Sequence, residues 1–246
     1  MLIKDNIDTA DRMKTSAGSL ALANVGAPRD ALLVKGLRAF GAVIIGKTNL
    51  SEWANFRSTK SVSGWSARGG LTRNPYALDR NPCGSSSGTG AAIAANLAAV
   101  GVGTETDGSI VCPSNACGLV GIKPTVGLVS QGGIIPISHT QDTAGPMART
   151  VADAATLLNA LASVDAASTA TDHRERPDYR MFAIDGGLRG ARIGVARNYF
   201  GFNPRVDRVL QHAIDAMKDA GGVVVDPAEV PTKRQFDGAV FDVLLY

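Results

Sequence analysis

The stretch from Cys83 to Pro113 constrains the fold of this chain more than any other part of it. It reads CGSSSGTGAAIAANLAAVGVGTETDGSIVCP. A loop rich in glycine and serine leads into a helix of small residues, predicted at about 87–98, and then into a short apolar strand at about 100–103. A loop–helix–strand–loop path can fold back on itself. It can therefore bring Ser85 and Ser109, which are 24 residues apart, to one place.

A second polar turn, Thr104 to Ser109, follows the predicted strand. Gly108 beside Ser109 lets the backbone take a conformation that a Cβ atom would hinder. Successive N–H groups in such a turn can point at one spot, which suits a developing oxyanion. We therefore assign Ser109 as the candidate nucleophile. The predicted oxyanion hole consists of the N–H groups of Thr106, Asp107, Gly108 and Ser109.

The rest of the chain alternates helical and strand patterns, which predicts an α/β fold. We expect a mixed, largely parallel twisted sheet that is covered by helices on both faces. Strands are predicted at 42–46, 119–123, 127–129, 191–196 and 223–225, helices at 30–40, 150–161 and 206–220, and a helical turn at 50–55. Residues 57–84 are predicted to form a long loop.

The composition changes twice along the chain, and these changes divide it into three parts. Residues 1–163 are expected to form the catalytic core. Residues 164–187, which include His173, are rich in Ser, Ala, Thr and charged residues. They are expected to form a solvated segment that connects the first part to the last. Residues 188–246 are expected to continue the same α/β domain. Both ends of the chain give the impression of being cut, because apolar strand-like runs lie at or near them.

Several classes of partner and cofactor are disfavoured by the sequence. The net charge is only +3 and no Lys/Arg run is present, so we expect no nucleic-acid partner. No window approaches the roughly 18 consecutive apolar residues of a membrane span. Gly90 is followed by two alanines rather than by Lys and Ser/Thr, which excludes a phosphate-binding P-loop. We expect no cofactor and no metal.

The three cysteines, Cys83, Cys112 and Cys117, are odd in number and form no CxxC pair. We expect small buried thiols in a reducing compartment, with a disulfide or a metal site as the alternatives. The compartment itself is left open, with the cytoplasm as the default.

Three further motifs occur in a fixed order with the stretch that begins at Cys83: LIKDNI from Leu2, GWSARGG from Gly64, and QDTAGPM from Gln141. Together they resemble the amidase signature family of serine amidohydrolases, and most nearly its peptide amidase branch, which removes the C-terminal amide of peptides. The resemblance is dense over 1–163 and thin over 188–246. Members of this family are normally much longer. The resemblance thus implies that part of this protein's own chain is missing.

The chemistry of amide hydrolysis needs a base for the nucleophile. The three histidines lack a triad context and Ser109 has no GxSxG elbow, which leaves Lys4. A free lysine has a pKa of about 10.4, and burial can lower it by about 3–5 units. The resemblance implies that Lys4 is the base and that Ser85, commonly on a cis peptide bond, relays the proton from Ser109. It also implies supporting hydrogen bonds from Ser87 and Thr104.

Less specific interpretations of the same residues stay open. Lys4 alone would usually be a surface lysine, and a Gly/Ser loop can simply cap a helix, here through Ser86 or Ser87. Asp142 is expected to hold a turn beside the site. Asp107 is an alternative contact for a polar or cationic substrate group.

The residues after Ser109 bear on the substrate. Many relatives carry an arginine there, which could pair with a substrate carboxylate, whereas this chain has Val111 and Cys112. We therefore expect a neutral amide or a peptide C-terminal amide as the substrate. The alternatives are the glutamine-hydrolysing subunit of a tRNA-dependent amidotransferase and an inactive fragment.

Overall fold

The structure is a computed structural model that describes residues 1–162, 177–233, 235 and 237–245. The chain divides into two compact units, Met1–Arg180 and Met181–Leu244. The predicted connecting segment, 164–187, lies largely outside the described residues, as does His173. The expectation that 188–246 continues the domain of the first part stays a prediction.

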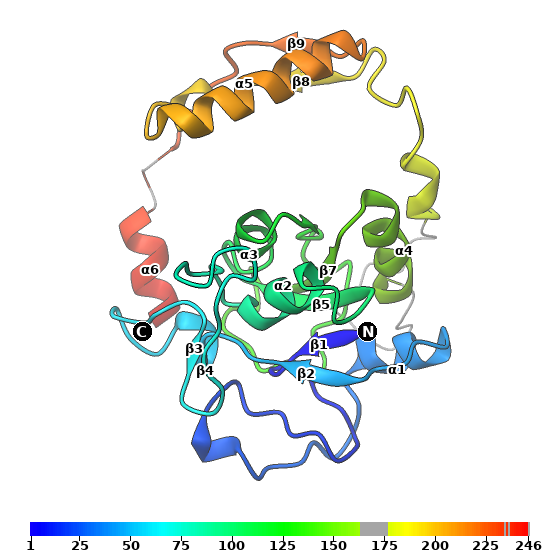
Figure 1. Ribbon diagram of the computed structural model, residues 1–246, viewed down its shortest axis with the longest axis vertical. Coiled ribbons are helices and arrows are strands. Elements are labelled where there is room, and N and C mark those ends of the chain that lie inside the picture. Colours follow the sequence, from blue (N-terminus) through cyan, green and yellow to red (C-terminus); the bar gives the residue numbers. More distant parts are fainter. Residues whose placement is uncertain (163–176, 234, 236, 246) are drawn as a thin grey trace. The chain divides into compact units, whose positions relative to one another are not determined.

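The first unit is built on a five-stranded sheet in the order β2-β1-β5-β7-β6 (Figure 1). Its strands are β1 (Leu2–Lys4), β2 (Gly46–Thr48), β5 (Val100–Glu105), β6 (Val120–Gly121) and β7 (Thr143–Ala148). β1 runs parallel to both β2 and β5, whereas β7 runs antiparallel to both β5 and β6. The predicted mixed α/β sheet is therefore confirmed, with its parallel pairs on one side and its antiparallel pairs on the other.

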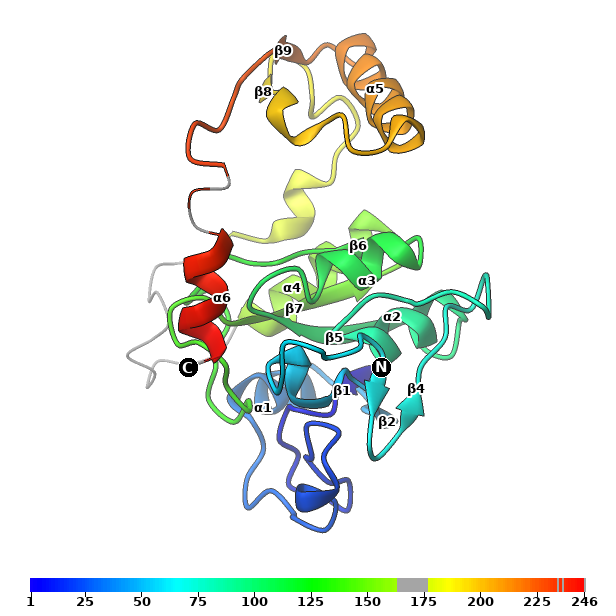
Figure 2. The same ribbon diagram turned by 90° about the vertical axis from the view of Figure 1, so that its left-hand side faces the viewer.

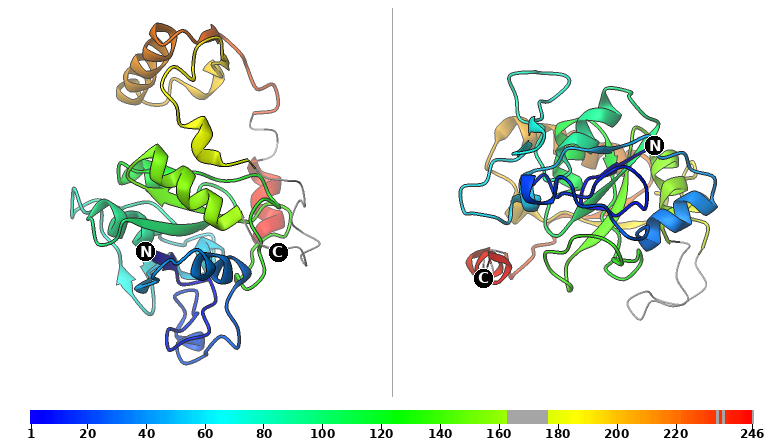
Figure 3. Two further views of the ribbon diagram at one scale, coloured as in Figure 1. Left: turned by 90° about the vertical axis from the view of Figure 1, so that its right-hand side faces the viewer. Right: turned by 90° about the horizontal axis from the view of Figure 1, so that it is seen from below.

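Helices cover both faces of this sheet. They are α1 (Leu32–Ala39), α2 (Ser87–Ala94), α3 (Val111–Ala116) and α4 (Val151–Ala162). Side chains of α1 and α4 join Ile3 and Val102 in one buried apolar cluster, and Figure 3 shows α4 lying along the strands. The residue of β5 before Val102, Gly101, faces α2, because a Cβ atom there would lie 2.6 Å from Thr89 Cγ2. The absence of a side chain at Gly101 thus lets α2 pack closely on the sheet.

Smaller elements fill the long connections of the first unit. They are the 3-10 helices η1 (Leu20–Leu22) and η2 (Glu52–Asn55), and a two-stranded hairpin of β3 (Trp65–Ser66) and β4 (Gly70–Leu71). A turn is present where a helical turn was predicted at 50–55, but Trp53 and Ala54 have φ values of 50° and 54°, so η2 is not a regular right-handed helix. The long loop predicted at 57–84 is confirmed except for the short hairpin inside it.

The second unit contains a strand–helix–strand motif, which is seen from another side in Figure 2. β8 (Arg192–Gly194) pairs in parallel with β9 (Val223–Val225), and α5 (Pro204–Asp219) connects them. Asn203 caps α5 by accepting a hydrogen bond from the N–H group of Arg205. The strand–helix–strand pattern predicted here is confirmed, with boundaries shifted by at most two residues.

Three other elements belong to the later part of the chain: η3 (Tyr179–Phe182), η4 (Arg197–Tyr199) and α6 (Asp237–Leu245). None of the helices in the described ranges has both the length and the apolar character that a membrane crossing requires.

Two strand predictions in the first unit are wrong. The strand predicted at 42–46 begins only at Gly46, and Val43 and Ile45 are 71% and 61% exposed. Ala42 and Ile44 pack against the apolar cluster, whereas Val43 and Ile45 point outward. Met1 forms backbone hydrogen bonds with Val43 and Ile45, but the ladder with β1 is regular only from Gly46 on. The run at 127–129 forms a turn, because Gly127 takes a φ of +88° that a strand does not allow.

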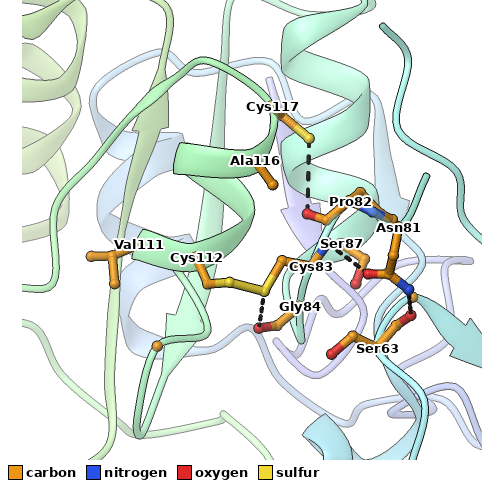
Figure 4. Close-up of a disulfide and its surroundings, with 12 residues drawn as sticks. Ser63, Asn81, Pro82, Cys83, Gly84, Ser87, Val111, Cys112, Ala116 and Cys117 are labelled. Atoms are coloured by element: carbon orange, nitrogen blue, oxygen red, sulfur yellow. Dashed lines mark hydrogen bonds between the residues drawn. A yellow bond between two sulfur atoms is a disulfide. The ribbon is translucent and has the colours of Figure 1, made fainter. Parts of the chain in front are cut away.

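The cysteine prediction is wrong for two of the three residues. Cys83 and Cys112 form a disulfide with a Cα–Cα distance of 5.8 Å (Figure 4). The two residues are far apart in sequence, but packing of α2 against α3 brings the ends of their loops together. Cys117 is a free, buried thiol as expected, and burial raises its pKa to about 11.

The core predicts how a substitution in α1 will behave. Leu37 is fully buried between α1 and the sheet, so Leu37→Ala should lower the free energy of unfolding by about 2–5 kcal/mol. Leu97→Ala is the matched control, because Leu97 is 67% exposed and should change it by no more than about 0.5 kcal/mol. Urea unfolding of both variants measures the difference. Equal effects at the two leucines would contradict the assigned core.

Candidate active site

The alternation of side chains along β1 places Lys4 on the face of the sheet opposite to the apolar core. Ile3 pairs with Val102 and shares its buried apolar face, so its neighbour Lys4 points toward the α2 face. Lys4 is completely buried. Its Nζ atom lies 2.7 Å from Ser85 Oγ, 2.8 Å from Thr104 Oγ1 and 3.1 Å from the Thr104 carbonyl oxygen. The amine thus has three polar neighbours in a site that excludes water.

Burial changes the protonation of this amine. It lowers the pKa of Lys4 from 10.5 to about 7, because the ammonium loses its hydration. The carboxylates of Glu105 and Asp142 act in the opposite direction and raise this pKa, but they do not cancel the effect of burial. About half of the Lys4 side chains therefore carry an uncharged amine near pH 7, and this form can accept a proton.

Ser85 lies in a tightly fitted loop just before α2. The Gly84–Ser85 peptide bond is cis, as the family resemblance implied. Gly84 has no room for a side chain, because a Cβ atom there would lie 2.4 Å from Ser51 Oγ. The Ser85 carbonyl accepts a hydrogen bond of 3.1 Å from the N–H group of Ser51. These contacts fix the backbone that presents the Ser85 hydroxyl to Lys4.

Ser109 lies in the turn between β5 and α3 and is 4% exposed. Its carbonyl accepts a hydrogen bond of 3.2 Å from the N–H group of Ser86, so the backbones of the two serine loops are in direct contact. The predicted unusual turn is present, because Gly108 has a φ of +78°. Within the described residues the hydroxyls of Ser85 and Ser109 form no hydrogen bond with each other. The relay between them stays a prediction.

Glu105, which was not among the predicted site residues, shapes this turn. One carboxylate oxygen accepts the N–H group of Gly108 at 2.9 Å, and the other accepts those of Ile110 and Val111 at 2.6 and 2.9 Å. Because the N–H group of Gly108 points at Glu105, the N–H groups of Thr106, Asp107 and Ser109 remain as candidates for the oxyanion hole. The sequence does contain one signal for this role: a carboxylate placed shortly before the start of a helix can accept the free N–H groups there.

Two other polar residues hold the surroundings of the site. Asp142 accepts the hydroxyl of Thr106 at 2.5 Å and the N–H groups of Ile137 and Ser138 at 2.7 and 2.9 Å, so it holds a turn as expected. Asn6, which the sequence analysis missed, donates to Thr104 Oγ1 at 3.0 Å. Both residues line a hollow of about 380 Å³ beside the turn.

The walls of this hollow are mixed in character. Residues 134–137 form an apolar wall of three isoleucines and a proline, and Thr104, Glu105 and Thr106 form the side nearest the turn. Trp53 lines a smaller neighbouring hollow of about 210 Å³, which shares Asn6 and residues 135–137. Trp53 thus lines a pocket.

The predicted supporting residues differ in how they contact the site. Thr104 contacts Lys4 directly, whereas Ser87 lies 3.4 Å from the Ser51 hydroxyl. Ser86 precedes α2 but does not cap it through its side chain. Its hydroxyl instead donates to the Thr104 carbonyl at 3.1 Å and accepts from the Thr104 N–H at 3.2 Å. The predicted side-chain cap at Ser86 is therefore wrong, because β5 competes for that hydroxyl.

Comparisons with known proteins cover the whole chain. A family model described as Amidase matches residues 1–246. A probable amidase of Arabidopsis thaliana is 45% identical over 235 residues, which make up 94% of this chain and 44% of that protein. A glutamyl-tRNA(Gln) amidotransferase subunit of Carboxydothermus hydrogenoformans is 40% identical over 94% of this chain and 47% of its own length. The chain thus spans about half the length of these relatives.

Solved structures agree with these matches. The native peptide amidase from Stenotrophomonas maltophilia has a TM-score of 0.91 and 55% identity, and the match covers 100% of this chain and 50% of that chain. The corresponding glutamyl-tRNA(Gln) amidotransferase subunit of Thermotoga maritima has a TM-score of 0.88 and 32% identity, with 99% and 52% covered. A family match over its whole length, together with this shared fold, shows that the chain belongs to the amidase family.

Proposed function

We propose that the protein containing this chain hydrolyses a carboxamide to a carboxylate and ammonia through an acyl-enzyme, with Lys4, Ser85 and Ser109 as the catalytic residues. The observation that carries the proposal is the position of the Lys4 amine. It is fully buried, it has a pKa of about 7, and it lies 2.7 Å from the Ser85 hydroxyl. A lysine with this environment is suited to act as a base.

In the first half of the reaction, the uncharged Lys4 amine takes the proton of the Ser85 hydroxyl, and Ser85 takes the proton of Ser109. The Ser109 oxygen attacks the amide carbon, and the carbonyl oxygen becomes an oxyanion that N–H groups of the turn stabilise. The Lys4 ammonium then returns a proton through Ser85 to the amide nitrogen. The C–N bond breaks, ammonia leaves, and the acyl group stays on Ser109.

In the second half, a water molecule acts as the nucleophile in place of the Ser109 hydroxyl. It gives a proton toward Lys4 through Ser85 and attacks the acyl carbon. The tetrahedral intermediate collapses, Ser109 recovers its proton from the relay, and the product leaves as a carboxylic acid, which then gives its proton to ammonia or water and becomes the carboxylate. Lys4 ends uncharged, so the cycle consumes one water molecule and releases one ammonia.

The substrate that the site favours is a neutral amide, in particular the C-terminal amide of a peptide. The hollow beside the turn has an apolar wall at 134–137, which suits an uncharged substrate side chain. The carboxylates of Glu105 and Asp142 within it already accept N–H groups of the protein. No arginine stands directly after Ser109 to pair with a free substrate carboxylate. The 55% identity to a peptide amidase supports the same choice.

A second candidate function is glutamine hydrolysis in a tRNA-dependent amidotransferase. It is favoured by the 40% identity to a glutamyl-tRNA(Gln) amidotransferase subunit. This function would require partner subunits. Hydrolysis of a peptide amide by the protein alone therefore separates the two candidates.

The first prediction concerns the substrate and the nucleophile together. The full-length protein should release ammonia from a peptide amide without ATP, tRNA or a partner, and from glutamine much more slowly. Ser109→Ala should lower kcat by at least about 10⁴-fold and abolish labelling by a fluorophosphonate probe, because the attacking oxygen is lost. An ammonia assay and peptide mapping of the label measure both. A label on a different serine would reassign the nucleophile.

The second prediction concerns pH. Because Lys4 must be uncharged to act as a base and its pKa is about 7, kcat/KM should fall about tenfold per pH unit below pH 7 and level off above it. Lys4→Met should lower kcat by about 10²–10⁴-fold. Lys47→Met in β2 is the control, because Lys47 contacts Thr15 and not the serines. This variant should show the same fall of kcat/KM below pH 7, the acidic limb of the profile, as the unmodified protein. A pH–rate profile of Lys4→Met like that of the unmodified protein would exclude Lys4 as the base.

The third prediction separates the two effects of Glu105. Glu105→Gln replaces one of the two carboxylate oxygens that hold the turn by an NH2 group, which cannot accept. The N–H groups proposed for the oxyanion hole should then be misplaced, and kcat should fall by about 10²-fold. The negative charge that raises the pKa of Lys4 is also lost, so the acidic limb should move to lower pH. Glu52→Gln changes a carboxylate that accepts the N–H group of Ala67, away from the site, and it should change neither quantity. A limb that stays in place would show that Glu105 does not act on Lys4.

A further inference from the structure

The disulfide joins the two segments that carry the candidate catalytic serines. Cys83 lies two residues before Ser85, and Cys112 lies three residues after Ser109. Figure 4 shows the bond crossing from the loop before α2 to the first turn of α3. The sulfur–sulfur bond is thus a covalent connection, separate from the hydrogen-bond network of Lys4, between the two loops whose hydroxyls must meet.

We propose that the Cys83–Cys112 disulfide is a positioning device that keeps the segments of Ser85 and Ser109 side by side, so that turnover depends on its integrity. The proposal rests on the function proposed above. It assigns the two cysteines a role in the reaction beyond stabilising the fold.

The non-covalent contacts between the two segments are hydrogen bonds. The Ser86 hydroxyl donates to the Thr104 carbonyl and accepts from the Thr104 N–H group, five residues before Ser109. The backbones share one hydrogen bond, from the N–H group of Ser86 to the carbonyl of Ser109 at 3.2 Å. Lys4 and Thr104 contact the Ser85 side, and Glu105 holds the Ser109 side. No side-chain hydrogen bond joins Ser85 to Ser109 in the described part of the chain. The disulfide adds a covalent link to these hydrogen bonds.

The conformation at Cys83 also calls for such a constraint. Cys83 has a φ of +60°, in the left-handed region that non-glycine residues seldom adopt. Its N–H group donates to the side chain of Asn81 at 2.7 Å, and the next residue, Gly84, fits against Ser51 without room for a Cβ atom. Residues in this region persist where their surroundings hold them in place. Breaking the disulfide removes one of these restraints directly beside Ser85.

The proposal predicts a specific kinetic signature. The contact of Lys4 with Ser85 and the burial of Lys4 do not involve the sulfur atoms. Loss of the bond should therefore leave the pKa of Lys4 in place while the alignment of the two serines deteriorates. A misplacement of about 1 Å in a catalytic site can cost about 10²-fold in rate. We expect kcat to fall at least about tenfold, with little change in KM and an unmoved acidic limb.

The bond can be broken chemically as well as by mutation. A dithiol such as dithiothreitol attacks one protein sulfur as a thiolate and forms a mixed disulfide. Its second thiolate then closes the reagent ring. Two electrons and two protons are transferred in total, so Cys83 and Cys112 become thiols and the reagent becomes a cyclic disulfide. Both cysteines are half-buried, not fully enclosed.

The experiment compares the full-length protein with Cys83→Ser/Cys112→Ser and with Cys117→Ser. Steady-state kinetics on a peptide amide are measured with and without dithiothreitol, at a temperature where circular dichroism shows each variant folded. The double variant should have the reduced kcat and ignore the reductant. Cys117→Ser, which alters only the free cysteine, should have normal kcat and lose it on reduction. Mass spectrometry counts the free thiols, and reoxidation should restore the rate.

Each outcome decides the proposal. An unchanged kcat in the folded double variant overturns it, and so does an unchanged rate in the unmodified protein once both thiols are shown to be free. If the double variant does not fold, reduction of the already folded protein gives the answer. A shifted acidic limb would overturn the positioning role in favour of a change around Lys4. Activity in Ser109→Ala would instead contradict the proposed function itself, irrespective of the disulfide.

Discussion

The site depends on the burial of a single amine. Lys4 is the largest fully buried side chain of the described residues, and it lies in a polar niche rather than among apolar groups. Removing the ammonium from water disfavours its charge, and this effect exceeds the attraction of Glu105 and Asp142, since the net result is a pKa lowered to about 7. Both carboxylates are held by N–H groups of the protein.

The sheet topology explains how a strand of three residues can present this amine. β1 lies between β2 and β5, so both of its edges are paired and its side chains alternate strictly between two covered faces. Ile3 belongs to the apolar cluster with α1 and α4, and Lys4 consequently meets the loop at the start of α2. The glycines of β5 let α2 approach closely enough for this contact. The reach of Lys4 to Ser85 is thus a consequence of strand pairing and of small residues.

The parts of this arrangement that could be predicted are those with a local signature. Strand and helix periodicity predicted α1, α4, α5 and the order of β8 and β9, and motifs predicted that Lys4, Ser85 and Thr104 would meet. Contacts that depend on three-dimensional proximity were missed. The disulfide escaped because its cysteines are separated by α2 and β5, and Glu105 escaped because the N–H groups that it accepts belong to a turn of irregular shape. The strand at 42–46 was placed too early because apolar character alone does not show where regular strand pairing begins.

The two serine segments are held by three kinds of bond that respond to different conditions. The amine of Lys4 has a pKa of about 7, so a change of pH alters its hydrogen bond with Ser85. The carboxylate of Glu105 holds the Ser109 side through main-chain donors that do not titrate. The disulfide joins the two segments and is broken by reduction rather than by a change of pH. Under the two proposals, a change of pH acts on the base, whereas reduction acts on the spacing of the serines.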